Sequence, residues 1–232
     1  MPDMLEKSRL LMLALAVCLA APALAAPPLP ADPRAARAVQ DYLRQMQAED
    51  SQARDQRVAD RIDALASNPA SPVLGNPKGD VTIIVLSDYA CPYCKQAEPR
   101  LMALASADKG VRLVMKEYPI LTKPSMTASR MALAAHRQGK YRPFHLALMR
   151  REGVLDDAGI LETARAAGID VNRARRDMLA PEVSDEIIAN FNLARSIRAF
   201  QTPTYIVGGH ILTSDSADID FAREVAAARR RR

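Results

Sequence analysis

Two cysteines separated by two residues carry the most distinctive chemistry in this sequence. The motif is Cys91-Pro92-Tyr93-Cys94, and the 232-residue chain has one further cysteine, Cys18. A disulfide stabilises a fold by closing a long loop, and a bond between Cys91 and Cys94 closes almost none. The pattern therefore indicates a Cys91–Cys94 disulfide that is made and broken in use, rather than a structural cross-link.

A metal site is the second chemistry that a cysteine pair can support. Structural zinc takes four ligands, and a single CxxC motif supplies two of them. The sequence has three histidines and no second cysteine pair. We therefore expect no metal site and no other cofactor.

Residues 1–26 have the order of a secretory signal peptide. Positive charge at Lys7 and Arg9 precedes the apolar run Leu10–Ala20, and a small-residue cleavage pattern ends at Ala25. The apolar run is too short to span a bilayer comfortably, and no later segment approaches a membrane span. We expect cleavage near residue 25, which removes the third cysteine, and a soluble mature protein in the periplasm.

The net charge of +5 indicates little about partners. Much of the excess comes from the C-terminal run Arg229–Arg232. A nucleic-acid-binding face would interleave basic residues with aromatic ones, and the chain has only six tyrosines, four phenylalanines and no tryptophan. We expect a solvated basic tail and no nucleic-acid partner.

A long helix is predicted from Asp32 to about Ala66, with Asp32 as its N-cap and Pro33 at its first position. Its middle, Gln47–Arg57, is strongly polar. Such a helix buries little by itself, so it must pack on the domain or on another chain. A brace on the domain and a stalk that forms a homo-oligomer are equally compatible with the sequence.

A strand, a helix and a second strand follow the proline-containing linker Ser67–Gly79. Val81–Leu86 is a nearly continuous apolar and β-branched run, typical of a strand buried on both faces. The helix is predicted at Lys95–Ala107 and the second strand at Val111–Lys116. This order predicts a βαβ unit.

The rest of the chain is mostly helical and then returns to strands. Apolar residues at three- and four-residue spacing predict helices at Ala128–Gln138, Tyr141–Arg150, Ala158–Ala167 and Asp185–Ala199. Two short strands and a closing helix are predicted at Thr204–Val207, His210–Thr213 and Asp218–Ala228. The sequence thus predicts one α/β domain with a helical insertion.

The cysteine motif lies where the first buried strand ends and a helix begins. The sulfur of Cys91 can therefore meet unpaired N–H groups of the first helical turn, and the helix dipole favours negative charge there. We expect a lowered pKa and a nucleophilic role for Cys91, with Cys94 as the resolving thiol one turn away. The histidines sit in no catalytic pattern: His136 and His145 are interpreted as ordinary helix residues and His210 as an exposed one.

The sequence resembles the DsbA-like branch of the thioredoxin superfamily, and more narrowly the ScsC-type periplasmic proteins. The resemblance covers nearly the whole mature chain, and the matching segments are Ser71–Pro77, Gly79-Asp80, Asp88–Lys95, Lys116–Leu121 and Thr202–Thr204. It implies a thioredoxin fold with a helical-domain insertion and an extra N-terminal helix. The implied organisation is a signal peptide (1–26), a helical segment and linker (27–70), the first half of the thioredoxin fold (71–122), the inserted helical subdomain (123–200), and the second half with the basic tail (201–232).

The resemblance also implies roles for residues outside the motif. Thr202-Pro203 would be a cis peptide bond in a loop that faces Cys91, with Thr202 tuning that sulfur. A glutamate common in the family six residues before the first cysteine is replaced here by Val85. Asp88 or Glu117 could take over its support of proton transfer, although Asp88 fits a turn or helix cap better.

The function that this resemblance implies is disulfide exchange with client proteins that carry cysteines or disulfides, regenerated by a redox partner in the membrane. The Pro-Tyr dipeptide leaves the direction of electron flow open. The N-terminal helix favours an oligomeric isomerase or reductase, and the alternative within the enzymes is a monomeric oxidase. A copper-binding or chaperone-like dithiol protein is the alternative outside them, since copper tolerance is associated with the ScsC-type proteins and Cu(I) accepts thiolates.

Overall fold

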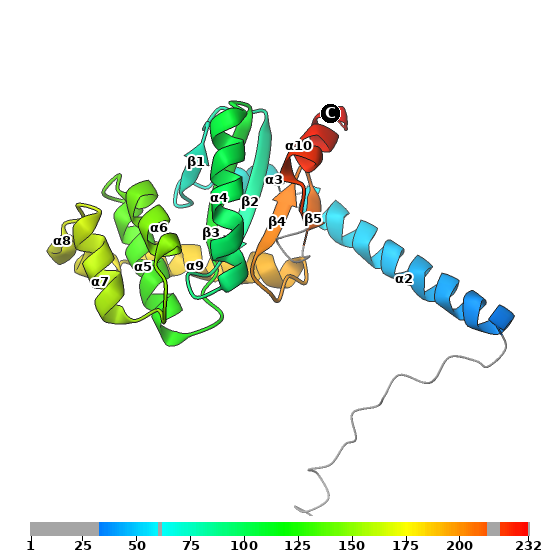
Figure 1. Ribbon diagram of the computed structural model, residues 1–232, viewed down its shortest axis with the longest axis horizontal. Coiled ribbons are helices and arrows are strands. Elements are labelled where there is room, and N and C mark those ends of the chain that lie inside the picture. Colours follow the sequence, from blue (N-terminus) through cyan, green and yellow to red (C-terminus); the bar gives the residue numbers. More distant parts are fainter. Residues whose placement is uncertain (1–32, 60–61, 213–218, 232) are drawn as a thin grey trace, which may run out of the picture. The chain divides into compact units, whose positions relative to one another are not determined.

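A computed structural model describes residues 33–59, 62–212 and 219–231 (Figure 1). The signal-peptide and cleavage predictions, Cys18 and Arg232 lie outside these residues. The chain divides into two compact units, 1–49 and 50–232. The boundary falls within helix α2 (Pro33–Ala59), which together with α3 (Ile62–Ser67) occupies the range of the predicted N-terminal helix.

A five-stranded sheet forms the centre of the second unit, in the order β1-β3-β2-β4-β5. The strands are β1 (Val73–Gly75), β2 (Val81–Ser87), β3 (Val111–Glu117), β4 (Thr204–Val207) and β5 (His210–Leu212). Strands β2 and β3 are parallel, and the other neighbouring pairs are antiparallel. The helix between β2 and β3, α4 (Pro92–Ala107), completes the predicted βαβ unit.

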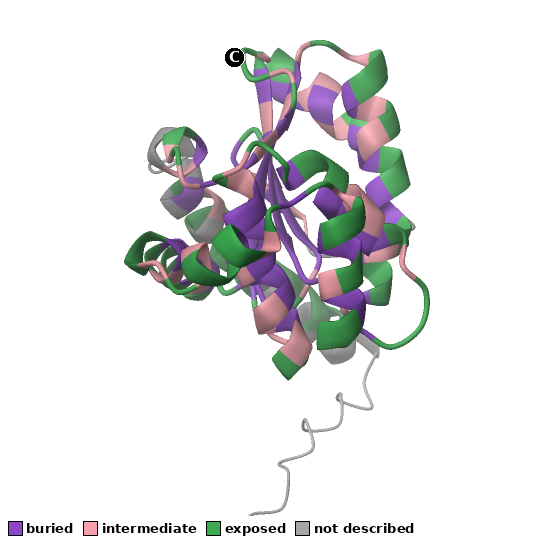
Figure 2. Ribbon diagram, turned by 90° about the vertical axis from the view of Figure 1, so that its left-hand side faces the viewer, coloured by how far each residue is buried: buried purple, intermediate pink, exposed green. Residues whose placement is uncertain are grey.

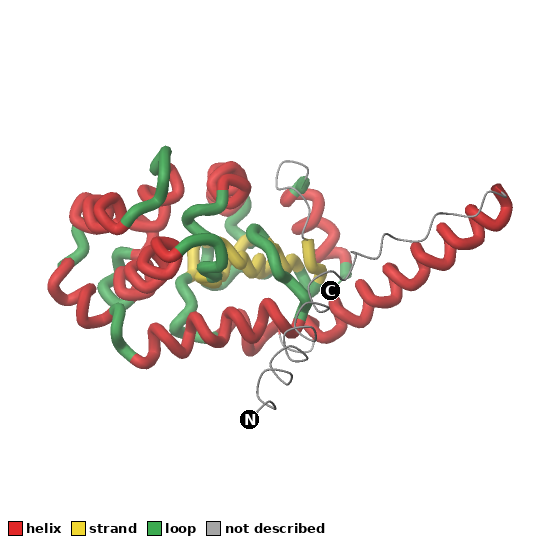
Figure 3. Tube along the Cα trace, turned by 90° about the horizontal axis from the view of Figure 1, so that it is seen from below, coloured by secondary structure: helices red, strands yellow, loops and turns green. Residues whose placement is uncertain are grey.

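Alternation along the strands divides the apolar core between the two faces of the sheet. Ile83 and Val85 of β2 pack with α4 and with α10 (Phe221–Arg230). Ile84 and Leu86, one residue on in each case, pack against the end of α9 (Pro181–Ser196). Helices consequently cover both faces (Figure 3), and the strands are buried at the centre (Figure 2).

Helices α5 to α9 lie between β3 and β4 in the chain. They are α5 (Lys123–His136), α6 (Tyr141–Arg150), α7 (Asp157–Ala166), α8 (Val171–Asp177) and α9. Helix α5 packs against α6, α7, α8 and α9, and α6 also contacts α4. Helix α6 thereby joins this helical segment to α4, which carries the cysteine motif, and α9 contacts β3. Among the described residues, no helix is long and apolar enough to cross a membrane.

The structure departs from the sequence predictions at three points. Strand β1 lies within the segment interpreted as a linker, and α8 was not predicted. The basic C-terminus is not simply a solvated tail, because Arg229 lies in α10. Its guanidinium bonds the carboxylates of both Asp80 and Asp108, at 2.8–3.0 Å, and so ties α10 to the loops that flank β2 and β3.

Candidate active site

The reactive centre is built at the N-terminus of α4. Cys91 is the N-cap residue, and its sulfur accepts a hydrogen bond from the backbone N–H of Cys94 at 3.3 Å. Pro92 occupies the first helical turn, where its missing N–H has no helical partner to lose. Both cysteines are buried, and each is a free thiol in this structure. Tyr93, in contrast, is 51% exposed.

The two thiols have opposite acidities. The pKa of Cys91 is lowered to about 6, first because the Cys94 thiol donates a hydrogen bond to it, and then through Thr202 and backbone N–H groups of the first turn. Burial, followed by the neighbouring Cys91 sulfur, raises the pKa of Cys94 well above its usual range. At neutral pH Cys91 is therefore mostly thiolate while Cys94 stays protonated. The Cys94 thiol thus acts together with the helix terminus that the sequence predicted.

The loop before β4 forms the wall facing Cys91. The Thr202–Pro203 peptide bond is cis, as the resemblance implies. In its protonated form, the Cys91 thiol donates to the carbonyl oxygen of Thr202 at 3.3 Å. The Thr202 hydroxyl is buried beside the Cys91 sulfur and has no well-aligned hydrogen-bond partner among the described residues. Thr202 and Pro203 are thus brought together with the cysteine motif.

Asp88 holds two loops at the end of the sheet. One of its carboxylate oxygens accepts the N–H of Ala90, and the other accepts the N–H groups of Ile120 and Leu121, all at 2.8–3.0 Å. Asp88 is fully buried. These contacts tie the segment before Cys91 to the segment after β3, as expected of a turn-forming aspartate.

Glu117, at the end of β3, lies in a buried polar network. Its carboxylate accepts hydrogen bonds from three hydroxyl groups, those of Tyr89 at 3.1 Å, Tyr141 at 2.9 Å and Ser129 at 2.8 Å. Burial nevertheless raises the pKa of Glu117 to about 7, because these donors and the nearby His145 only partly compensate for the lost solvent. Glu117 can therefore exchange a proton near neutral pH.

The network continues to α4 through His145. Its Nδ1 lies 2.9 Å from the hydroxyl of Tyr89 and 3.2 Å from that of Tyr141. Its Nε2 lies 3.2 Å from Oε1 of Glu98, a contact that is close enough for an ion pair but poorly aligned for a hydrogen bond. Glu98 is buried, four residues after Cys94 on the same buried face of α4.

Sequence reasoning missed Glu98, and it misinterpreted His145 as an ordinary helix residue. Two spacings in the sequence could have pointed to these residues. Glu98 follows Cys94 at i+4 between the apolar Ala97 and Leu101, and His145 follows Tyr141 at i+4, where it stacks on the tyrosine ring at 5.1 Å. The contact between Glu98 and His145 itself cannot be predicted from such spacings, because it joins α4 to α6. His210 lies in a different contact, with its Nδ1 2.9 Å from Asp55.

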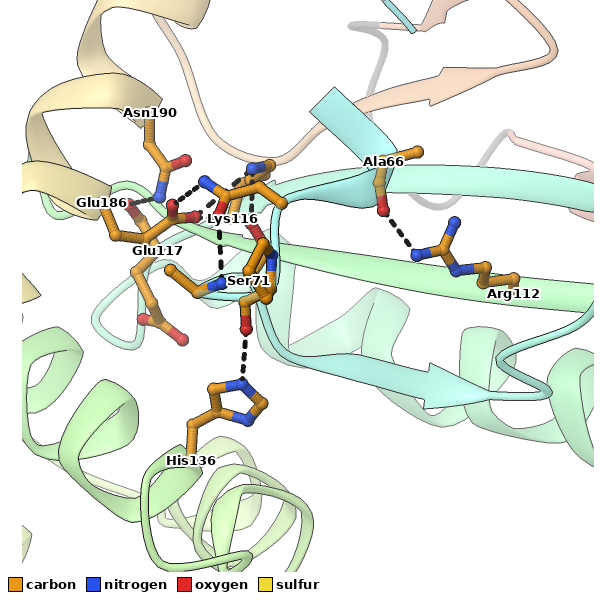
Figure 4. A network of polar contacts seen from close by, with 11 residues as sticks. Ala66, Ser71, Arg112, Lys116, Glu117, His136, Glu186 and Asn190 are labelled. Carbon is orange, nitrogen blue, oxygen red and sulfur yellow. Dashed lines mark hydrogen bonds and ion pairs between the residues drawn. The ribbon is translucent and has the colours of Figure 1, made fainter. Parts of the chain in front are cut away.

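A second buried network lies on the other face of β3 (Figure 4). The ammonium of Lys116 lies 2.6 Å from the hydroxyl of Ser71 and 3.3 Å from Glu186 of α9. Glu186 also accepts from Ser71 at 2.7 Å and from Asn68 at 2.6 Å. These contacts fix α9 and the segment before β1 to the end of β3, next to Glu117.

Among the described residues, no three histidine, cysteine or acidic side chains gather in a way that could hold a metal ion. The site instead offers a thiolate at a helix N-terminus, a protonated thiol one turn away and a cis-proline loop facing the thiolate. On a thioredoxin fold, this arrangement is that of the thiol–disulfide oxidoreductases. More narrowly, the model of the DsbA-like thioredoxin domain matches residues 82–226. The match covers more than half of the chain, and the protein belongs to this family.

Two solved structures illustrate the likeness. A thioredoxin-like oxidoreductase from Silicibacter pomeroyi is 41% identical, covering 72% of this chain and 97% of its own, with a TM-score of 0.69. A linker-deletion mutant of Proteus mirabilis ScsC is 23% identical, covering 92% and 100%, with a TM-score of 0.73, and shows the likeness of fold alone.

A curated relative of a different kind also matches. The Na(+)/H(+) antiporter NhaA 3 of Salinispora tropica is 29% identical over 139 residues, which is 59% of this chain and 21% of the antiporter. The chain thus spans about a fifth of the length of the curated relatives it matches.

Proposed function

We propose that the protein exchanges disulfides with client proteins through Cys91 and Cys94. The observation that carries this proposal is the position of the Cys91 sulfur, which caps the N-terminus of α4 and faces the cis-proline loop, and this position goes with a lowered pKa of Cys91, about 6. The Cys91 thiolate attacks one sulfur of a client disulfide, and the other client sulfur leaves as a thiolate. Cys94 then loses its proton and attacks Cys91, which releases the reduced client and leaves the Cys91–Cys94 disulfide. In the oxidising direction the same steps run in reverse.

The direct test is the reduction of insulin and the repair of scrambled ribonuclease. We expect activity in both from the mature chain and none from Cys91→Ser. Cys94→Ser keeps the nucleophile but cannot resolve, so it should accumulate a mixed disulfide with the client, detectable as added mass. Full activity of Cys91→Ser in either assay would overturn the proposal.

We propose net reduction or isomerisation as the direction of exchange, over oxidation. A more stable thiolate makes a dithiol a stronger oxidant, and the pKa of Cys91, about 6, lies closer to the value of about 7 in thioredoxin than to about 3.5 in DsbA. The reduction potential should accordingly fall between about −270 mV and about −120 mV. A monomer with a potential near about −120 mV would instead identify a DsbA-like oxidase.

We propose that α2 assembles the chain into a homo-oligomer. The helix has 27 residues, and its predicted polar segment, Gln47–Arg57, leaves it little apolar surface of its own to bury. An assembly would present several dithiols together, which suits an isomerase. Deletion of residues 27–66 should reduce the mass in solution to that of a monomer and lower ribonuclease repair more than insulin reduction. An unchanged mass would refute the assembly role.

We propose that Glu117 supports the proton transfer of Cys94 through the network that ends at Glu98. Glu117 exchanges a proton near neutral pH, and Glu98 lies one helical turn from Cys94. The oxygens of Asp88 are occupied by backbone N–H groups, so we assign Asp88 to loop positioning. Glu98→Gln and Glu117→Gln should slow resolution of the mixed disulfide and shift its pH profile, and leave the first attack by Cys91 unchanged. Unaltered resolution in both variants would contradict this role.

We place this exchange in the periplasm, with a membrane redox partner that restores the active form of the dithiol. The order of charges, apolar run and small residues in the first 26 residues supports export. Fractionation of cells that express the full chain should recover a protein shortened near residue 25 from the periplasm. Recovery of the uncut chain from the cytoplasm would contradict this placement.

A further inference from the structure

A groove lies beside the cysteine motif, between α4 and the C-terminal end of α6. Its cavity volume is about 840 Å³, and Ala90 and Pro92 line the end next to the reactive centre. One wall is α4, through residues such as Met102, and the other is α6, through Leu146 and Met149. We call it the α4–α6 groove. Because Ala90 and Pro92 flank Cys91 in the chain, one end of the groove lies next to the nucleophile.

The lining of the groove suits an apolar chain of variable sequence. Pro92 and Pro99 are exposed, and Met102 and Leu146 are half-buried, so apolar surface is open to solvent within the groove. A methionine lies on each wall, and Met102 on α4 is half-buried while Met149 on α6 is buried. Because methionine is flexible and polarisable, such walls adapt to side chains of different shapes. This is what an enzyme with many clients needs.

The rim of the groove is cationic. Lys95, Arg150 and Arg151 line it against two acids, Glu98 and Glu152. Three of these charges have partners within the fold. The ammonium of Lys95 bonds the carbonyl oxygen of Arg151 at 2.6 Å, the guanidinium of Arg151 pairs with Glu162 at 3.0 Å, and Glu98 faces His145 at 3.2 Å.

Arg150 differs from these residues. It is exposed at the end of α6 and makes no ion pair with any of the described residues. It is thus the rim cation most available to a bound molecule, and an acidic side chain on the bound molecule would complement it.

We propose that the α4–α6 groove binds an extended client segment adjacent to the client's reacting cysteine, with apolar side chains in the groove and an acidic side chain at Arg150. This inference rests on the proposed disulfide exchange and adds a client preference to it. The apolar contacts would hold the segment while the Cys91 thiolate attacks. The charge at Arg150 would raise the association rate of segments that carry an acidic side chain.

The test uses peptides that carry one cysteine as a mixed disulfide with thionitrobenzoate. The Cys91 thiolate attacks the peptide sulfur, the peptide becomes disulfide-bonded to Cys91, and thionitrobenzoate leaves as a coloured thiolate. Three peptides are symmetric about the cysteine, so the direction of binding does not matter: Asp-Leu-Leu-Cys-Leu-Leu-Asp, its lysine-ended counterpart, and Asp-Ser-Ser-Cys-Ser-Ser-Asp. All are measured on a Cys94→Ser background. Each rate is divided by that of the mixed disulfide with mercaptoethanol, which removes any change in the reactivity of Cys91 itself.

We expect the acidic leucine peptide to react about threefold to tenfold faster than the lysine or serine peptide. Arg150→Glu should reverse the order of the acidic and lysine peptides. Arg142→Glu makes the same charge change at an exposed position of the same helix, outside the groove, and should keep the original order. Leu146→Ser should reduce the advantage of leucine over serine, and its far-ultraviolet circular dichroism shows whether it is folded.

The outcomes separate the two proposals. If the three peptides react equally, or if Arg150→Glu and Arg142→Glu shift the rates alike, the groove is not the docking site, although disulfide exchange stands. If no peptide releases thionitrobenzoate, the proposed function itself fails.

Discussion

Lys116 and Glu117 are neighbours at the end of β3, point to opposite faces of the sheet, and are both buried. Lys116 faces an opposite charge, because Glu186 lies 3.3 Å away and receives further hydrogen bonds from Ser71 and Asn68. Glu117 is held chiefly by neutral donors, the hydroxyls of Tyr89, Tyr141 and Ser129. The first network pairs two opposite charges, and the second leaves the Glu117 carboxyl able to take up a proton.

This difference separates a structural network from a chemically active one. Removing one member of a buried charge pair leaves the other uncompensated, which is strongly destabilising. The pair of Lys116 and Glu186 therefore stabilises the contact between β3 and α9. A buried acid held by hydroxyls can change its protonation state instead, and the pKa of Glu117 is raised to about 7. Cys91 resembles Glu117 in this respect, since the first group that stabilises its charged form is a neutral donor, the Cys94 thiol.

The largest effect is expected on the Lys116 side. Glu186→Ala strips a buried ammonium of its counter-charge and should lower the free energy of unfolding by about 3–5 kcal/mol. Glu182→Ala is the matched control on the same helix. Glu182 pairs at the surface with Arg137, so its loss should cost no more than about 1 kcal/mol. Guanidinium denaturation measures both, and equal losses would show that the Lys116 network is not a buried charge pair.

Glu117 should make stability depend on pH. Its pKa is raised on folding from 4.5 to about 7, so its contribution is fully present below about pH 4.5 and is lost as pH rises through about 7. This loss amounts to about 3 kcal/mol. Glu117→Gln cannot ionise and should lack that part of the decline. Denaturant titrations at about pH 4.5 and about pH 8 measure the difference, with Glu182→Gln as a control that should follow the wild type. Parallel curves for wild type and Glu117→Gln would contradict a titrating Glu117.

The smallest effect is a shift in the reactivity of Cys91. Cys94→Ala removes the donor that contributes most to the lowered pKa of Cys91, so that pKa should rise toward the usual value of about 8.5. Alkylation of Cys91 at about pH 6 should then slow by about tenfold. Cys94→Ser keeps a hydroxyl donor and should lie between the wild type and Cys94→Ala. Equal rates for all three proteins would show that the helix N-terminus alone sets the acidity of Cys91.

The sequence predicted the parts of the fold that carry strong local patterns. The apolar run of β2 and the helical periodicity after Cys94 were sufficient for the βαβ unit. The three-residue strand β1 has no such pattern, since it lies in a proline-containing segment and exists because it pairs with β3. Likewise, the sequence predicts Arg229 as part of a basic tail, because its partners Asp80 and Asp108 are distant in the chain and lie close to it only in the fold.

The candidate site was predictable in its cysteines and in its cis-proline loop, the first from the residues and the second from the family resemblance. The sequence predicted Glu117 as a candidate for proton transfer but did not predict the network around it. Its members come from β3, α4, α5 and α6, and their partners are chosen by helix packing rather than by spacing in the chain. The same holds for the acidity of Cys91, to which the Cys94 thiol contributes besides the helix terminus that the position of the motif predicted.

The most direct test of a reactive Cys91 is a pH titration of the reduced protein by the ultraviolet absorbance of its thiolate. We predict one transition with a midpoint near pH 6, absent in Cys91→Ser, while Cys94 stays protonated through the neutral range. A midpoint near the free-thiol value of about 8.5, or a transition near pH 6 that persists in Cys91→Ser, would contradict the assignment of Cys91 as the nucleophile.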